Sequence, residues 1–343
     1  MGGQDQLSVL QCSEFDDGSN KQLSKFEKSE NFNFMISDIS ESINESIERL
    51  TSGDFDLISC SGIAWNNYSE SKDQLAVVAV LPRRDASWVI VSEDNLYYLI
   101  KDAKIVCNSE LITRQLKRAR PDLEIINFGT WNKENKTDYN SMKILNNLEE
   151  SRRSGIIQGY AISRSDWESS GIKARRHTLG MYKSEKNDSR FTPPPLHGFC
   201  LLVSRLGFPN NLVDGINDIT SQNIFFLESM LESNMDPKVK GIIGIHVAQR
   251  RIGSLLKQAK TDDDLTLKSS TVSPEGDIES VQTRFEVIIE LPDVEGKFTL
   301  VLERITPLES ANYLSHIIMG DWNELYRVAI GNDSADNGNT RLF

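Results

Sequence analysis

The chain has 343 residues, which is too many for one small hydrophobic core and predicts two or three domains. Its 50 acidic and 38 basic residues give a net charge of −12, which argues against a nucleic-acid partner, because phosphate contacts need clustered basic residues. The sequence has neither an apolar run long enough to span a bilayer nor a basic start followed by an apolar stretch. We therefore expect no membrane partner and a cytoplasmic location.

The first third of the chain changes from polar to strongly patterned. Residues 1–33 are polar, and we expect no regular element of the first domain there. Apolar residues then recur at helical spacing from Ile36 to Leu50, and Gly53 is a natural helix stop. Short, nearly all-apolar runs predict buried strands at 55–60, 75–81, 88–92 and 104–109.

The middle of the chain alternates helices and strands. A helix is predicted from Glu110 to Ala119, ahead of Pro121. Further elements are a strand at 123–128, a helix at 140–153, a strand at 155–162, a proline-rich loop at 183–195 and a strand at 199–204. This alternation predicts α/β layers with mostly parallel strands.

The last part of the chain predicts a helix, several strands and a closing helix. The helices are expected at 221–234 and 308–328, and the strands at 241–248, 265–271, 283–291 and 298–305. Residues 260–282 are acidic and rich in serine, which indicates a loop or hairpin. Residues 331–343 are expected to be a disordered tail.

The four cysteines are widely spaced, without a Cys-x-x-Cys pair: Cys12, Cys60, Cys107 and Cys200. This spacing favours reduced, buried thiols over a disulfide framework or a metal site. The sequence also has no Gly-rich phosphate loop and no His/Cys set at metal-ligand spacing, so no metal is expected.

Several segments carry motifs of one known family in the correct order. Pro82, Arg83, Asp85 and Ser92 match the family's Pro-Arg-Glu-Asp…Ser strand. Further matching segments are 34–61, 118–125, 193–205 and the segment LESMLESNMDPKVKGIIGIHVA at 227–248. In this order the chain resembles hydroxymethylbilane synthase, also called porphobilinogen deaminase, over about residues 8 to 330.

The resemblance implies an α/β fold with two type II periplasmic-binding-protein-like domains around a cleft, and a C-terminal α+β domain. Domain 1 would comprise residues 1–96 and 194–218 and would lack the family's first strand and helix. Domain 2 would comprise residues 97–193, and domain 3 residues 219–330. The chain would cross from domain 1 to domain 2 near residues 93–101.

The resemblance also implies an activity in tetrapyrrole (haem) biosynthesis, the polymerisation of porphobilinogen to hydroxymethylbilane. In the family, a catalytic aspartate stabilises the cationic intermediate, an arginine pair binds substrate carboxylates, and a cysteine thioether holds the dipyrromethane cofactor. Ala64 occupies the aspartate position, Leu111 and Ile112 the arginine positions, and Val239 the cysteine position. A methyl group cannot stabilise a cation, and valine cannot form a thioether. We therefore expect a degenerate synthase without a catalytic residue or a cofactor.

The alternative is a catalytically inactive binding or regulatory protein that uses the same cleft. Its ligand would be a small carboxylated or pyrrolic molecule, or it would bind a protein partner. Candidates for residues facing the cleft are Ser61, Ser109, Arg114 and His197, although Arg114 also fits an exposed basic helix face and His197 a loop histidine without a role. A third possibility is a two-domain solute-binding protein unrelated to porphyrins. We expect a monomer.

Overall fold

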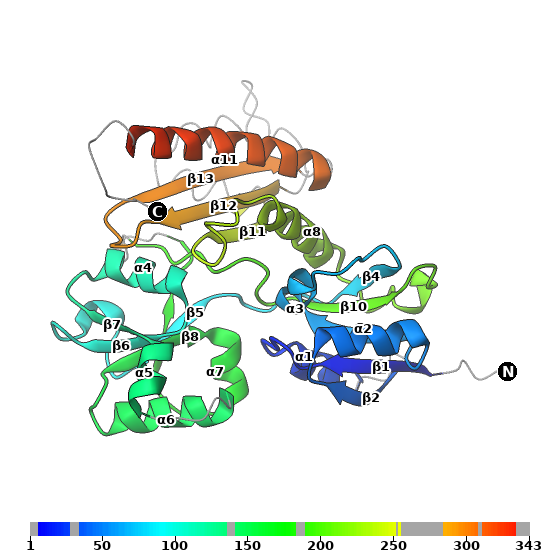
Figure 1. Cartoon of the computed structure of the whole chain (residues 1–343), viewed down its shortest axis with the longest axis horizontal. Coiled ribbons are helices and arrows are strands. Elements are labelled where there is room, and N and C mark those ends of the chain that lie inside the picture. The colour runs from blue at the N-terminus through cyan, green and yellow to red at the C-terminus, as the bar shows by residue number, and fades with distance from the viewer. Residues whose placement is uncertain are drawn as a thin grey trace.

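The structure is a computed structural model that describes residues 6–27, 34–135, 141–182, 189–251, 253–254, 284–307 and 311–333. These residues form three sheets with their covering helices (Figure 1). We call the unit at the lower right of Figure 1 domain 1, the unit at the lower left domain 2, and the unit that lies across the top of both domain 3.

Domain 1 contains a five-stranded sheet in the order β2-β1-β3-β10-β4. β1 is parallel to β2 and β3, whereas β10 is antiparallel to β3 and β4. The strands are β1 (Leu7–Cys12), β2 (Phe34–Ser40), β3 (Leu57–Ser61), β4 (Leu75–Val80) and β10 (Cys200–Arg205). The helices are α1 (Ser19–Glu27), α2 (Ile43–Ser52) and α3 (Gly62–Asn67), and the 3-10 turn η2 (Asn210–Leu212) follows β10.

Domain 2 repeats this arrangement with its sheet in the order β7-β6-β8-β5-β9. β6 is parallel to β7 and β8, and β5 is antiparallel to β8 and β9. The strands are β5 (Trp88–Ser92), β6 (Lys104–Cys107), β7 (Glu124–Asn127), β8 (Gly159–Ser163) and β9 (Arg176–Leu179). The helices are η1 (Leu96–Tyr98), α4 (Glu110–Ala119), α5 (Phe128–Asn135), α6 (Ser141–Arg153) and α7 (Arg164–Ser170).

The two sheets share the topology of type II periplasmic binding proteins. Each has three parallel strands with the first strand in the middle, then one antiparallel strand, then a fifth strand. The antiparallel strands, β5 and β10, are those that follow the two crossings between the domains. The predicted fold class, two such domains around a cleft with a third α+β domain, is therefore confirmed.

Domain 1 has its own first strand and helix, so the prediction that it lacks them is wrong. β1 lies between β2 and β3, and α1 follows it. Hydrophobic patterning does not reveal this strand because polar residues interrupt it, although these polar residues have hydrogen-bond partners in the fold. The Gln11 side chain is buried and donates to the Asn20 carbonyl, and Ser8 donates to the Asp56 carboxylate.

Two further boundaries differ from the predictions. Residues Phe34–Ser40 form the edge strand β2 rather than the start of a helix, and the helix begins at Ile43. β5 belongs to the sheet of domain 2, so the chain crosses between Val80 and Trp88 rather than near residues 93–101. The all-apolar runs of β4 and β5 are alike, and neither run indicates to which sheet it belongs.

Domain 3 is an antiparallel sheet in the order β11-β12-β13, packed against two helices. Its elements are α8 (Ile219–Ser233), β11 (Gly244–Arg250), β12 (Arg284–Pro292), β13 (Thr299–Pro307) and α11 (Ala311–Asp333). α11 extends to Asp333, past the point where the tail was expected to begin. The predicted strand at 265–271, the segment 260–282 and residues 334–343 lie outside the described residues.

Domains 1 and 3 share one hydrophobic core, whereas domain 2 has separate cores. The shared core includes Leu10 and Phe199 of domain 1 and Phe225 and Trp322 of domain 3. Domain 2 has two clusters of its own, one around Ile105 and one with Tyr160. Domain 3 thus packs as an apolar extension of domain 1.

Domain 2 contacts domain 3 mainly through charged groups at helix α4. Glu290 of β12 is buried and forms an ion pair with Arg118 of α4, and Arg190 lies 3.9 Å from its other oxygen. Thr192 and Gln115 also donate to Glu290. Because a buried carboxylate needs such partners, this Glu290 cluster fixes the position of α4 against β12.

Candidate functional site

A cleft of about 370 Å³ lies where the two α/β domains meet. Its lining comes from all three domains and from the segment that returns from domain 2 to domain 1. The lining residues are Phe15, Asp16, Asp17, Ile63, Trp88, Asn108, Ser109, Glu110, Asp166, Pro194, His197 and Gly241. In open α/β folds, ligands bind at this place, outside the carboxyl ends of the parallel strands.

An apolar pocket of about 270 Å³ in domain 2 adjoins the cleft. Trp88, Asn108 and Asp166 line both cavities. The rest of the pocket is formed by Val106, Phe128, Leu145, Leu148, Ala161, Ile162 and Ser163. The two cavities together have the combination that small-molecule sites use, a mostly apolar wall with a few polar groups at one end.

Serine residues begin three helices at the ends of sheet strands. Ser61 accepts a hydrogen bond from the Ala64 amide at the start of α3, Ser109 from the Ile112 amide in α4, and Ser163 from the Asp166 amide in α7. These N-caps satisfy backbone donors that the first helical turn leaves free. Of these three helix starts, those of α4 and α7 contribute residues to the cleft, Ser109 and Asp166.

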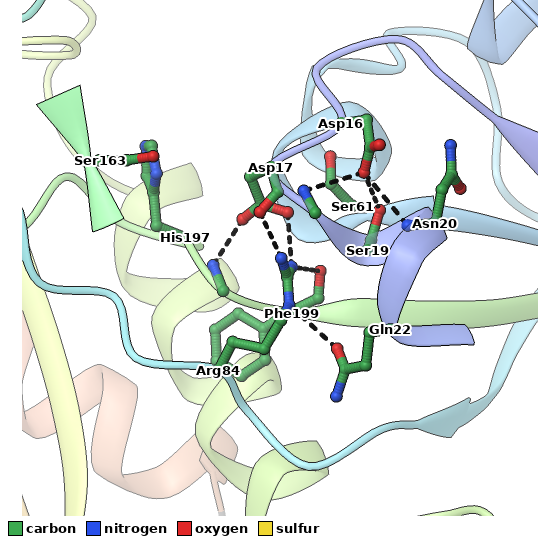
Figure 2. Close-up of polar contacts among 12 residues, drawn as sticks. Asp16, Asp17, Ser19, Asn20, Gln22, Ser61, Arg84, Ser163, His197 and Phe199 are labelled. Carbon is green, nitrogen blue, oxygen red and sulfur yellow. Dashed lines mark hydrogen bonds and ion pairs between the residues drawn. The ribbon is translucent and has the colours of Figure 1, made fainter. Parts of the chain in front are cut away.

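The loop between β1 and α1 brings two aspartates to the cleft (Figure 2). One oxygen of Asp16 accepts hydrogen bonds from the Gly18 amide, the Ser19 hydroxyl and the Asn20 amide, and thereby caps α1. Asp17 is buried, and its carboxylate lies 2.6 Å from the Arg84 guanidinium. The carboxylate of Asp17 therefore already has a positive partner, whereas Asp16 has none among the described ion pairs.

Asp166 faces these aspartates from domain 2. Its side chain is exposed at the cleft surface, and one oxygen accepts a 2.6 Å hydrogen bond from the Ser163 hydroxyl. The surrounding protein reduces its hydration and raises the pKa of Asp166, and the negative charges of Asp17 and Asp16 raise it further. A carboxyl group with a raised pKa in a cleft is a candidate for contact with a ligand.

His197 lies in the return segment, beside Trp88. The two ring centroids are 6.4 Å apart. Burial is the largest cause of the lowered pKa of His197; the negative charge of Asp17 opposes the lowering, and the positive charges of Arg83 and Arg84 add to it. The imidazole is therefore neutral at pH 7 and adds no positive charge to the cleft.

The structure places the predicted cleft residues in different surroundings. Ser109 and His197 line the cleft. Ser61 is fully buried as the cap of α3, and Ile63 lines the cleft in its place. Arg114 was wrongly assigned to the cleft, because it is buried against domain 3, where it donates to the Pro292 carbonyl.

The two positions that correspond to the synthase's aspartate and cysteine lie in the hydrophobic core. Ala64 and Val239 are both buried in the core that domains 1 and 3 share. The loop that carries Val239 does reach the cleft, but through Gly241. Neither Ala64 nor Val239 presents a reactive group to a ligand.

Most of the lining residues, including Asp16, Trp88 and Asp166, are absent from the sequence-based candidates. Asp16 lies in the N-terminal segment that has no clear periodicity, and Trp88 was regarded only as part of a strand. A sequence pattern does exist for Asp166, because Ser163-x-x-Asp166 has the spacing of a helix capping box. That pattern predicts a helix start but gives no reason to expect a cleft.

Among the described residues, no group of three or more His, Cys, Asp or Glu side chains is arranged to hold a metal ion. No helix in the same part of the chain is both long and apolar enough to cross a membrane.

Comparison with known proteins gives only weak structural similarities. No protein-family model and no curated protein matches the sequence. Among solved structures, an ABC transporter protein from Parabacteroides distasonis is 11% identical, with a TM-score of 0.38, over 78% of this chain and 83% of that one. The aliphatic sulphonate-binding protein SsuA of Escherichia coli is 16% identical, with a TM-score of 0.33, over 67% and 75% of the two chains.

A third similar structure is the zinc-bound ligand-binding component of an ABC-type import system from Staphylococcus aureus. It is 12% identical, with a TM-score of 0.32, over 66% of this chain and 73% of that one. Similarities at this level do not identify a ligand for this chain.

Proposed function

We propose that this chain is a binding protein for a small molecule, which it holds in the cleft between domains 1 and 2. One observation carries the proposal. Both domains line the cleft, and the cleft adjoins an apolar pocket of domain 2. A ligand there would contact Asp16 on one side and Asp166 on the other. The two sides of this site come from different domains, Asp16 from domain 1 and Asp166 from domain 2.

Polymerisation of porphobilinogen has little support in this site, because it needs a thiol that can hold the primer. All four cysteines are buried. Burial raises the pKa of Cys107 to about 11 and that of Cys200 to about 12, and it also raises the pKa values of Cys12 and Cys60. Since the thiolate is the reactive form, these side chains are poor nucleophiles at neutral pH.

A carboxylated ligand, the expectation from the resemblance, also has little support. Arginine would be the natural partner of its carboxylates. However, Arg114 and Arg118 contact domain 3, and Arg84 pairs with Asp17. The polar groups left facing the cleft are mainly acidic.

Filling the cleft tests the binding function. Asn108 is exposed and lines both cavities, so Asn108→Trp should occupy the site without disturbing the core. In a thermal-shift screen of a metabolite library, we expect ligands that stabilise the wild type and fail to stabilise this variant. A ligand at a hundredfold excess over its Kd stabilises by about 2.7 kcal/mol, which such a screen detects.

The matched control is Lys101→Trp, at an exposed position of domain 2 outside the cleft lining. It should respond to ligands like the wild type. The proposal fails if no compound stabilises the wild type, or if every stabilising compound acts equally on the Asn108→Trp variant.

A colour reaction tests the synthase alternative separately. After incubation with porphobilinogen, we expect no colour with acidified aldehyde reagent and no increase in protein mass. A coloured protein with the added mass of a dipyrromethane would restore the synthase interpretation.

A further inference from the structure

We infer that the ligand of the cleft is a small amphiphilic cation, with a protonated amine between Asp16 and Asp166 and an apolar body in the adjoining pocket of domain 2. This inference rests on the proposed function, because it concerns the same cleft. It adds the charge, the orientation and the chemical class of the ligand.

Each side of the cleft has one carboxylate without an ion-pair partner among the described residues. Four acidic residues line it: Asp16, Asp17, Glu110 and Asp166. Arg84 pairs with Asp17, and Arg114 pairs with Glu110 at 3.0 Å. Asp16 of domain 1 and Asp166 of domain 2 have no ion-pair partner among the described residues. An ammonium group between them would receive charge-assisted hydrogen bonds from both domains.

Asp16 and Asp166 both keep one oxygen available for a ligand. The three hydrogen bonds of Asp16 involve only Oδ1, and the hydrogen bond of Asp166 with the Ser163 hydroxyl involves only Oδ2. The effect of Asp16 and Asp17 on the pKa of Asp166 indicates that these carboxylates interact across the cleft. A bound cation would relieve this repulsion.

Trp88 provides an independent indication of a ligand. It is 6% exposed and lines both cavities, yet its indole N–H has no hydrogen-bond partner among the described residues. Buried donors of this kind are rare in folded proteins and mark sites where a partner is missing. The ring also offers an aromatic face of the type that attracts ammonium groups.

The adjoining pocket specifies the remainder of the ligand. It shares Asp166 and Asn108 with the cleft, and its apolar lining includes Phe128, Leu145 and Leu148. A volume of about 270 Å³ accommodates a small aromatic or branched aliphatic group. Burial of that group would supply most of the binding free energy, whereas the two carboxylates would select the charge.

Three probes with the same hydrocarbon body test the inference: 2-phenylethylamine, 2-phenylethanol and 3-phenylpropionate. We expect the amine to bind the wild-type protein, measured by calorimetry and tryptophan fluorescence. The alcohol and the carboxylate should bind about tenfold more weakly or not at all. Asp166→Asn should weaken binding of the amine by about tenfold, the loss expected for one charge-assisted hydrogen bond.

Two variants separate binding from folding. Asp94→Asn makes the same substitution at an exposed site of domain 2 outside the cleft and should bind the amine normally. Asp166→Glu keeps the charge and should retain most of the affinity. Because the folded state raises the pKa of Asp166, its charged form is disfavoured by folding. The melting temperature of unliganded Asp166→Asn at pH 7 should therefore be unchanged or higher, while its affinity for the amine falls.

The possible failures are distinguishable. Tighter binding of the carboxylate than of the amine would overturn the inferred charge and leave a binding function in place. Amine binding that Asp166→Asn does not weaken would overturn the inferred contact. If none of the probes binds, the inferred ligand class is wrong, and the library screen with Asn108→Trp then decides the proposed function separately.

Discussion

Replacement of Glu228 by glutamine is expected to destabilise the protein by about 3–5 kcal/mol, because it leaves a buried arginine without its counter-charge. Glu228 is fully buried in α8, and its two oxygens lie 2.7 and 3.1 Å from the Arg83 guanidinium. The same oxygens accept hydrogen bonds from the backbone amides of Leu196 and Val247. The carboxylate thus joins both crossing segments to domain 3.

Urea unfolding followed by fluorescence and circular dichroism measures this loss. Glu45→Gln is the matched control, because Glu45 makes an exposed ion pair with Arg49 at 3.7 Å. Removal of such a surface pair costs less than about 1 kcal/mol. Similar midpoints for the two variants would show that the Arg83–Glu228 pair contributes no more than a surface pair.

Gly296→Ala is expected to displace domain 2 from domain 3. Gly296 has a φ of +73°, and an added Cβ would lie 2.5 Å from the Arg118 amide nitrogen and 2.8 Å from the Arg114 carbonyl oxygen. These are backbone atoms of α4 and cannot rotate away. The left-handed conformation costs about 1–2 kcal/mol and the overlap about 1–3 kcal/mol more.

The variant Gly207→Ala separates the cost of the left-handed backbone conformation from the cost of the steric overlap. Gly207 has a φ of +87°, but an added Cβ there would meet no atom within 4 Å. This variant should lose only the cost of the left-handed conformation, measured by the same urea titration. Equal losses for Gly207→Ala and Gly296→Ala would contradict the close approach of α4 to the β12–β13 turn.

Helices with a capping residue at one end and a helix-stopping residue at the other could be predicted from the sequence. The helix Glu110–Ala119 agrees with α4 at each end, because Ser109 caps its first turn and Pro121 prevents its continuation. The strand β1 could not be predicted, because its polar side chains have partners outside the strand, Asn20 for Gln11 and Asp56 for Ser8. Hydrophobic periodicity does not detect such partners.

The site was less predictable than the fold for the same reason. Ser109 and His197, chosen from their positions near a strand end and in a crossing segment, do line the cleft. Arg114 was not, because periodicity identifies a basic helix face but does not reveal that domain 3 covers it. Asp16 and Asp166 are separated by 150 residues in sequence, and only the assembled domains bring them to one cleft.

The position of β10 sets the order in which the nascent chain matures on the ribosome. β10 is hydrogen-bonded between β3 and β4, yet it is synthesised after all five strands of the neighbouring domain. At usual translation rates, β3 and β4 wait on the order of ten seconds for this strand. Domain 2 is therefore the first unit that can complete its sheet, and the facing edges of β3 and β4 stay unpaired until β10 has been made.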